Sequence, residues 1–393
     1  MTQGKGTAEA SLERLASALT EQGTLTSDWL PAFKRAPRKL FIPDLIWPGT
    51  AHGAEHAQGV LKSENPAAWW DAVASDIPIT TQWDDGQHDG RAVGKIPTSS
   101  NSMPSMVFSM LTDLSVSEGH RVLEIGTGTG WNAALLAARL GAENVTSVEV
   151  DTAVHEAARK AIENTGLVPT LVLGDGADGY TDHAPYDRLI ATASTGEIPR
   201  AWLEQVKPGG IIVTPWWPEY GGGAIVRLVV NEDGTAAGRF TRTAAFMRLR
   251  QQRRKPKHVR QYMGGKPWPA DGVRSMTQLS PEDIAGWLPM FVIGLQTRGV
   301  FPWAEEGEGD AYALWLRDTA VTSWATADYE PEAERFTVYQ SGPRDLWDEV
   351  EAAHRWWVQQ GRPGFDRFGL TVARDGRLTA WLDSPDRPVP CMS

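Results

Sequence analysis

The feature that most constrains this chain is an alternation of apolar runs and helical-period segments over residues 98–230. The apolar runs predict strands at residues 121–126, 144–150, 170–176, 186–193 and 211–216. Segments of helical period lie before and between them, at residues 102–114, 132–141, 152–166 and 199–210. Strands that are apolar on both faces are typical of a parallel sheet covered by helices. We therefore expect an α/β fold for this part of the chain.

The flanking regions have a different character. The N-terminal region predicts helices at residues 8–22 and 29–38, then a loop-rich stretch at 50–97 with one short strand at 77–79. The C-terminal region predicts helices at 280–295 and 342–364, strands between them, and a hairpin at 367–383. We expect three parts: an N-terminal helical and loop region (1–97), an α/β domain (98–250) and a C-terminal α+β region (251–393).

Composition excludes several classes of function. The net charge of −11 argues against general nucleic-acid binding, which needs a basic face. The chain has no run of about 18 apolar residues, so we expect no membrane-spanning helix. The single cysteine, Cys391, excludes an internal disulfide, and the sequence predicts no metal site. The first residues lack the apolar core of a signal peptide. We expect a cytoplasmic monomer.

Tryptophan is unusually frequent, with 18 residues. Indole side chains are enriched at recognition surfaces, but they also fill hydrophobic cores. Both interpretations stay open from composition, and the core interpretation is the more common.

A glycine loop follows the first strand of the α/β region. Its glycines are Gly126, Gly128 and Gly130, and Trp131 stands where a dinucleotide fingerprint has its third glycine. Glu124 lies at the end of the strand. This pattern fits a loop for S-adenosylmethionine better than a loop for NAD, although a purely structural glycine turn is the alternative.

Two further acids follow the next two strands. Glu149 can accept the ribose hydroxyls of a nucleoside, and Asp175, between two glycines, can accept from an adenine amine. Each taken singly could be an ordinary strand-end acid or turn residue. Since ligands bind at the carboxyl ends of parallel strands, the three features together predict a nucleoside cofactor.

These motifs resemble the protein-L-isoaspartate O-methyltransferase family. The resemblance rests on RVLEIGTGTGWNAALLA, VEVD, LVLGDGADG, YDRLIATAS, VKPGGIIVTP and, upstream, AFKRAPRKLFIPD and TSSNSMPSMVFSML. It implies a Rossmann-like methyltransferase sheet, carboxyl methylation and S-adenosylmethionine as cofactor, with S-adenosylhomocysteine as product. It also implies Ser102 as the catalytic serine. The implied cofactor-binding residues are Ser100, Met103, Gly126, Thr127, Gly128, Glu149, Val150, Asp175 and Gly176.

The chain departs from the repair enzymes of that family in length. Residues 50–90 look like an insertion, and we expect about 140 C-terminal residues to have no counterpart in those enzymes. Ser100 and Asn101 also differ from the common loop pattern. The extended form resembles stand-alone methyltransferases of graspetide and lanthipeptide pathways. That resemblance implies a cyclised precursor peptide as partner and an aspartate ester that closes to an aspartimide.

Elementary chemistry is compatible with this activity. A carboxylate is already an anionic nucleophile at neutral pH, so methyl transfer requires alignment rather than a general base. The Ser102 hydroxyl could orient one carboxylate oxygen, or it could make only a local turn. The basic stretch at 247–260 could attract an acidic substrate or be a solvated linker. Three functions remain: a peptide-tailoring methyltransferase, an isoaspartyl repair enzyme, and a cofactor-binding protein without catalysis.

Overall fold

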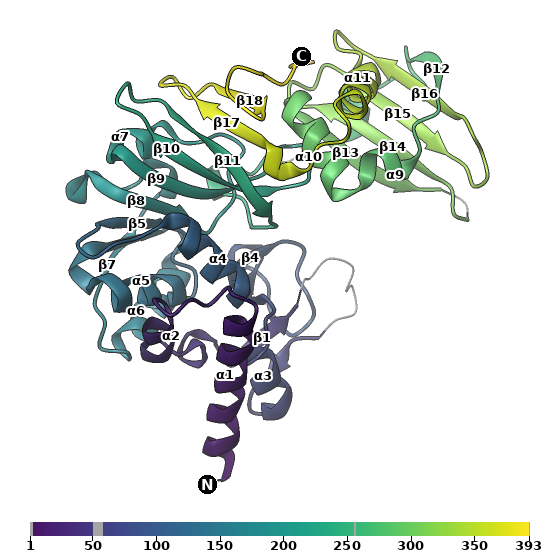
Figure 1. Ribbon diagram of the computed structural model, residues 1–393. Coiled ribbons are helices and arrows are strands. Elements are labelled where there is room, and N and C mark those ends of the chain that lie inside the picture. The colour runs from purple at the N-terminus through teal and green to yellow at the C-terminus, as the bar shows by residue number, and fades with distance from the viewer. Residues whose placement is uncertain (1–2, 50–57, 255–256, 308, 393) are drawn as a thin grey trace. The chain divides into compact units, whose positions relative to one another are not determined.

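The computed structural model describes residues 3–49, 58–254, 257–307 and 309–392. The chain forms two compact units (Figure 1). The first comprises residues 1–193, 199–214 and 229–234, and the second comprises residues 194–198, 215–228 and 235–393.

The core of the first unit is a parallel sheet with the strand order β9-β8-β5-β6-β7. Its strands are β5 (Val122–Ile125), β6 (Val145–Glu149), β7 (Thr170–Leu173), β8 (Tyr186–Ala191) and β9 (Val206–Trp216). The helices that accompany them are α4 (Pro104–Leu114), α5 (Trp131–Leu140), α6 (Thr152–Glu163) and α7 (Arg200–Gln205). The α/β fold expected from the alternation is therefore confirmed, and the order of strands and helices agrees with the expectation.

Burial explains why these elements form. Every residue of β5 and β6 is buried, as expected for central strands of a covered sheet. Helix α5 is buried along most of its length because α2 packs on one side of it and β6 on another. The sheet thus presents the ends of β5, β6 and β7 side by side.

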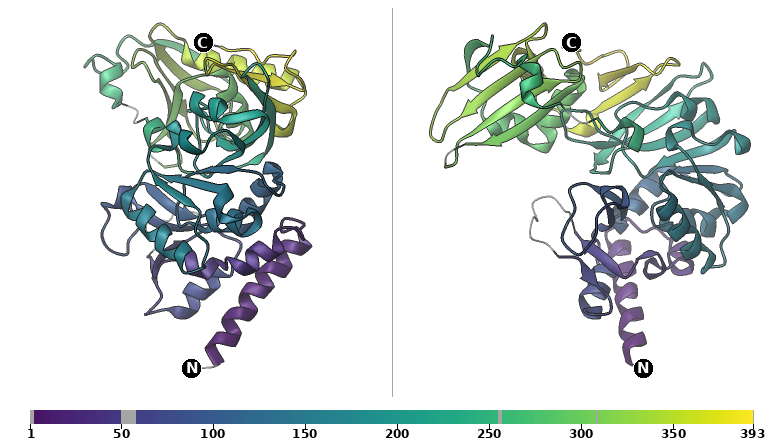
Figure 2. Two further views of the ribbon diagram at one scale, coloured as in Figure 1. Left: turned by 90° about the vertical axis from the view of Figure 1, so that its left-hand side faces the viewer. Right: turned by 180° about the vertical axis from the view of Figure 1, so that it is seen from behind.

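The N-terminal part of this unit contains more regular structure than the sequence indicated. Helix α1 (Gln3–Glu21) extends from the unit with the N-terminus at its tip (Figure 2) and buries Leu12, Leu15 and Leu19. It is followed by α2 (Leu30–Arg35) and the 3-10 turn η1 (Arg38–Phe41).

The stretch expected to be loop-rich was predicted wrongly over its described residues. It holds α3 (Pro66–Val73) and an antiparallel sheet in the order β2-β1-β3-β4, built from Leu45–Pro48 (β1), Val60–Leu61 (β2), Ile79–Trp83 (β3) and Pro97–Asn101 (β4). The predicted strand at 77–79 begins two residues later. Residues 50–57 of the expected insertion lie outside the described residues.

The second unit contains two groups of antiparallel strands. One group has the order β10-β11-β17-β18, with bounds Ala224–Val230, Ala236–Thr243, Phe368–Val372 and Leu378–Leu382. The other is a five-stranded sheet in the order β12-β16-β15-β14-β13, with bounds Val273–Thr277, Phe336–Ser341, Trp324–Tyr329, Tyr312–Asp318 and Val300–Glu306. The short helix α8 (Val259–Tyr262) precedes β12. The hairpin predicted at 367–383 is confirmed as β17 and β18.

The core of the second unit lies between the five-stranded sheet and its helices. Helix α11 (Leu346–Gln359) buries Leu346, Trp347 and Val350 against the sheet residues Leu316 and Val338. The helix predicted over 280–295 is two helices, α9 (Pro281–Ala285) and α10 (Trp287–Gln296), because the backbone at Gly286 is extended. The predicted serine cap at Ser280 forms a capping box with Asp283.

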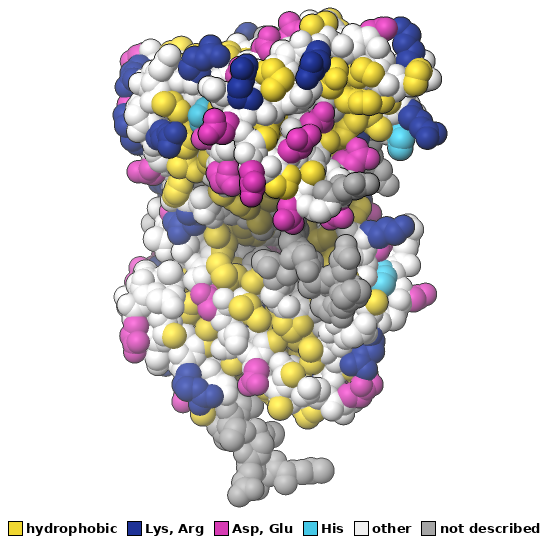
Figure 3. All heavy atoms as spheres, turned by 90° about the vertical axis from the view of Figure 1, so that its right-hand side faces the viewer, with side chains coloured by type: hydrophobic (Ala, Val, Ile, Leu, Met, Phe, Trp, Pro, Cys, Tyr) yellow, Lys and Arg dark blue, Asp and Glu magenta, His cyan; other side chains and the backbone are white. Residues whose placement is uncertain are grey.

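Most of the tryptophan side chains belong to hydrophobic cores. Five of them are less than 2% exposed: Trp69, Trp131, Trp202, Trp324 and Trp347. Trp268 and Trp303, by contrast, are 45% and 60% exposed. Figure 3 shows basic and acidic side chains on the face that it draws, with hydrophobic side chains between them. In the described part of the chain, no helix is both long enough and apolar enough to cross a membrane.

Candidate functional site

The glycine loop follows β5 with a backbone that favours glycine at three positions. Gly126, Gly128 and Gly130 have positive φ angles of 88°, 55° and 88°. A Cβ atom on Gly126 would lie 2.9 Å from Thr192 Oγ1, and one on Gly130 would lie 2.9 Å from Ile162 Cδ1. A side chain at either end of this loop would force its neighbours to move, and Gly128 in the middle lies beside the Ser100 carbonyl.

Glu149 lies against this loop at the end of β6. Its carboxylate accepts hydrogen bonds from the backbone N–H of Gly128 at 2.9 Å and from those of Val150 and Asp151 at 3.0 Å. The side chain is buried, and burial raises its pKa above the ordinary range, although these N–H donors oppose the shift. Two carboxylate oxygens offer about four acceptor positions, and three are used by these N–H groups, so about one remains for a hydroxyl group.

Asp175 and Gly176 lie at the end of the neighbouring strand β7. Asp175 accepts from the backbone N–H of Ala177 at 2.8 Å and caps the 3-10 turn η4 (Gly176–Asp178). The backbone N–H of Gly174 donates to the carbonyl of Glu149 at 2.9 Å. The second and third strand ends are thus joined, as the parallel-sheet argument predicted.

The serine-bearing segment connects β4 to α4. Ser100 belongs to β4, and Ser102 and Met103 precede Pro104, the first residue of α4. The Ser100 carbonyl lies next to Gly128, 3.4 Å from the position that a Cβ there would take. The structure therefore brings this segment and the glycine loop together. The Ser102 side chain is half-buried.

A buried polar network supports the loop from beneath. Glu124 is fully buried, accepts from Asn132 Nδ2 at 2.7 Å and is hydrogen-bonded by Ser147 Oγ. Burial raises the pKa of Glu124 to about 7, partly opposed by those two hydrogen bonds. Thr127 Oγ1 lies 2.6 Å from Ser147 Oγ, so the buried Thr127 side chain belongs to this network.

Sequence reasoning assigned no role to three side chains that connect these segments. Arg38, Asn101 and Thr129 are linked through hydrogen bonds from Arg38 to Asn101 and from Asn101 to Thr129. Asp76 accepts from the backbone N–H of Ser105 at 2.8 Å, in the first turn of α4. The available signal for Arg38 is its place in the Pro37–Pro43 segment PRKLFIP, which is part of the upstream family resemblance.

The basic stretch at 247–260 is not uniformly free to bind an acidic substrate. In the second unit, Arg248 lies 3.4 Å from Glu219 and Arg254 lies 2.9 Å from Glu197. Burial lowers the pKa of Arg248. These carboxylates neutralise part of the charge.

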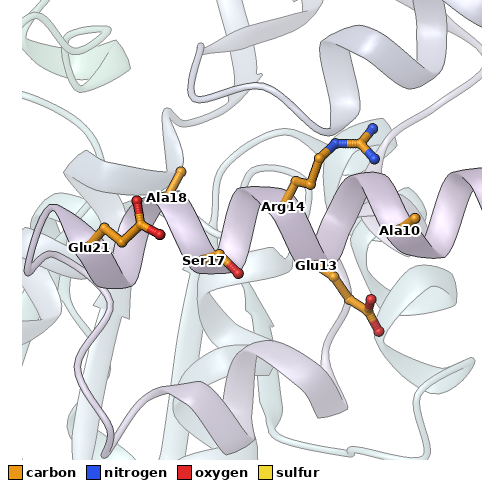
Figure 4. Close-up of a pocket in the computed structure, with 6 residues that line it drawn as sticks. All are labelled: Ala10, Glu13, Arg14, Ser17, Ala18 and Glu21. Atoms are coloured by element: carbon orange, nitrogen blue, oxygen red, sulfur yellow. The ribbon is translucent and has the colours of Figure 1, made fainter.

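Two hollows have linings that include none of the residues of the glycine loop. An open one runs along α1 (Figure 4) and is lined by Ala10, Glu13, Arg14, Ser17, Ala18 and Glu21. The other, of about 350 Å³, lies in the second unit, and its charged lining residues are Glu197, Glu219, Arg254, Arg298 and Arg377. Among the described residues, no three His, Cys, Asp or Glu side chains gather in a way that could hold a metal ion.

Comparison with known proteins identifies the family. Residues 82–254 match the family model described as protein-L-isoaspartate(D-aspartate) O-methyltransferase. The Thermococcus onnurineus protein-L-isoaspartate O-methyltransferase is 33% identical over 174 residues, which cover 44% of this chain and 78% of that protein. This chain belongs to the protein-L-isoaspartate O-methyltransferase family.

The alignments with two other relatives cover different shares of the two chains. The Pyrococcus horikoshii enzyme of the same name is 38% identical over 34% of this chain and 61% of its own length. The Methylorubrum extorquens enzyme is 32% identical over 56% of this chain and 79% of its own. The chain thus spans about three fifths to four fifths of these relatives.

A solved protein-L-isoaspartate O-methyltransferase also has this fold. It aligns with 95% of this chain and 100% of its own length, with a TM-score of 0.53 and 21% identity. The alignment extends well beyond the family model into the C-terminal region. The expectation that about 140 C-terminal residues have no counterpart in the family is therefore wrong at the level of fold.

Proposed function

We propose that the protein is an S-adenosylmethionine-dependent carboxyl O-methyltransferase that methylates an aspartyl side chain in a cyclised ribosomal peptide. The observation that carries the proposal is the convergence of the glycine loop, Glu149 and Asp175 at three neighbouring strand ends, beside the Ser100–Met103 segment. Membership of the family supports the reaction type.

The site fits a nucleoside cofactor. Glycines without side chains let a ligand come close to the loop backbone, and Glu149 keeps about one acceptor position for a ribose hydroxyl. We expect Asp175 and Gly176 to border the adenine, and Ser100, Met103, Thr127 and Val150 to line the rest of the cofactor site.

S-adenosylmethionine supplies an electrophilic methyl group on a sulfonium. When bound, it would give this methyl group to a substrate carboxylate oxygen as the carbon–sulfur bond breaks, with the electron pair left on sulfur. No proton moves, so the protein must align the two partners and exclude water. We assign to Ser102 the role of holding one carboxylate oxygen by donating its hydroxyl hydrogen.

The finer proposal concerns the peptide. In a methylated aspartate, the next backbone amide nitrogen can attack the ester carbonyl, and methanol leaves with the amide proton to give an aspartimide. A cyclised peptide has already lost conformational freedom that costs about 1–2 kcal/mol for each residue fixed. Of the tryptophans adjacent in sequence, Trp69 and Trp357 are buried, and Trp70 and Trp356 are half-buried.

Isoaspartyl repair is the second candidate, favoured by the names of the relatives and by the whole-length alignment with a solved enzyme of that name. The deciding assay follows methylation of three synthetic peptides by intact mass: cyclised with aspartate, linear with aspartate, and linear with isoaspartate. Gain of one methyl and then loss of methanol on the cyclised peptide supports tailoring. If the linear isoaspartyl peptide is the best substrate, the repair function replaces it.

A further inference from the structure

Arg38 is a buried cation with every hydrogen-bond donor in use. Its side chain has no solvent exposure. Nε donates to Asn101 Oδ1 at 2.7 Å, and the two terminal nitrogens donate to four backbone carbonyls. These carbonyls belong to Val73 (3.3 Å), Ser75 (2.8 Å), Ile77 (2.7 Å) and Ser102 (3.2 Å). Since a guanidinium has five N–H donors, none is left over.

The acceptors of Arg38 lie on segments that are far apart in sequence. Residues 73–77 lead from α3 to β3, Asn101 ends β4, and Ser102 follows it. Because the guanidinium is planar and rigid, it fixes the directions as well as the distances of these carbonyls. The Ser102 backbone is therefore held by a contact that leaves its hydroxyl out of the network.

Asn101 extends the connection to the glycine loop. Its Oδ1 accepts from Arg38, and its Nδ2 donates to Thr129 Oγ1 at 2.9 Å. Thr129 lies between Gly128 and Gly130. One amide thus bridges the segment that carries Ser102 and the loop that we assign to the cofactor. Asn101 is also one of the two positions at which this chain departs from the common loop pattern.

Stability alone is a poor reason for this arrangement. Burying a guanidinium costs free energy, and a hydrophobic side chain of similar volume often serves stability as well or better. None of the five acceptors is a carboxylate, and burial lowers the pKa of Arg38 to about 9 although Asp76 opposes the shift. The ring of Trp131, at 5.6 Å, adds only a cation–π contact.

We propose that Arg38, Asn101 and Thr129 form a positioning relay that sets the Ser102 segment against the glycine loop, and so aligns the substrate carboxylate with the methyl donor. This inference rests on the proposed function. The three are positioning residues, because they act through Ser102 and the loop.

The test uses the full chain with Arg38→Lys, Asn101→Leu, Thr129→Val and the double variant Asn101→Leu/Thr129→Val. Arg38→Lys keeps the positive charge and removes the planar guanidinium. Asn101→Leu keeps the approximate shape and breaks the hydrogen bonds to both Arg38 and Thr129. Thr129→Val breaks only the hydrogen bond to Asn101. Arg188→Lys and Asn144→Leu are matched controls. Arg188, like Arg38, donates to backbone carbonyls, and the Asn144 side-chain amide donates to the backbone carbonyl of Leu140.

Each variant is measured for thermal midpoint, for S-adenosylhomocysteine affinity by calorimetry, and for kcat and KM on the peptide that the wild type methylates best. We expect Arg38→Lys and Asn101→Leu to lower kcat about ten- to a hundred-fold while KM changes less than about threefold. Thr129→Val and Asn101→Leu should each weaken S-adenosylhomocysteine binding, and the double variant should be no weaker than Asn101→Leu. The controls should leave these values unchanged.

Folded variants with wild-type kcat, or additive effects in the double variant, would overturn the relay. Thr129→Val keeps the test decisive if Arg38→Lys fails to fold, because Thr129 is only half-buried. If the wild type methylates none of the three peptides, the proposed function fails, and the affinity measurements still decide whether Asn101 and Thr129 act together.

Discussion

Glu149→Gln is the sharpest test of the cofactor site. The substitution preserves side-chain shape but replaces one carboxylate oxygen with an NH2 group. In the structure, one oxygen accepts from Gly128 and the other from Val150 and Asp151. In either orientation of the glutamine amide, its NH2 group faces at least one of these backbone N–H groups, so two hydrogen-bond donors meet. The ribose hydroxyls also lose charged acceptors, and a hydrogen bond to a charged group contributes about 1.5–3 kcal/mol.

That range corresponds to a loss of about ten- to 150-fold in S-adenosylhomocysteine affinity, since each 1.4 kcal/mol is tenfold. Isothermal calorimetry at pH 7 measures it directly. Glu143→Gln is the control, because Glu143 is exposed and precedes β6 at the opposite end of the same strand. An affinity for Glu149→Gln within twofold of the wild type would refute the assignment of Glu149 to the ribose.

Three more outcomes are expected. Ser102→Ala should lower single-turnover methyl transfer about ten- to a thousand-fold and leave S-adenosylhomocysteine affinity nearly unchanged; wild-type rates would remove Ser102 from the mechanism. Glu124 has its folded pKa raised to about 7 from 4.5, so its contribution to stability is lost as pH rises between these values, by on the order of 3 kcal/mol. Glu124→Gln should therefore gain in urea midpoint relative to the wild type at pH 8 but not at pH 5, and parallel pH profiles would contradict this. Gly130→Ala should lower the thermal midpoint more than Gly119→Ala, which shares a positive φ but has open space around its Cβ position; equal losses would mean that contact with Ile162 is unimportant.

Local patterns were sufficient for the parallel sheet. The strands β5 and β6 lie in continuous apolar runs, because a strand that is buried on both faces has mostly apolar side chains at successive positions. The glycine loop could be recognised for a similar reason, since the positive φ angles at Gly126, Gly128 and Gly130 favour glycine at those positions. Because parallel strands end at the same edge of a sheet, the positions of Glu149 and Asp175 at strand ends then predicted that both lie at that edge.

Tertiary structure decided what depends on distant partners. Trp47 pairs with Thr80 where β1 and β3 lie antiparallel. The apolar residues in 58–97 show no repeating pattern that predicts this pairing. Likewise β9 begins at Val206, five residues before the strand predicted at 211–216, because Val206 pairs with Tyr186 of β8.

The relay at the site is the clearest case of information that only the tertiary structure holds. Glu149 and Asp175 could be proposed from sequence because each follows a strand, and the strand end itself places them. Arg38 reaches Asn101 across 63 positions of sequence, and Asn101 reaches Thr129 across 28. A hydrogen bond between side chains on separate elements depends on how those elements pack. The sequence therefore determined which residues could meet a nucleoside, and packing decided which residues hold Ser102 in place.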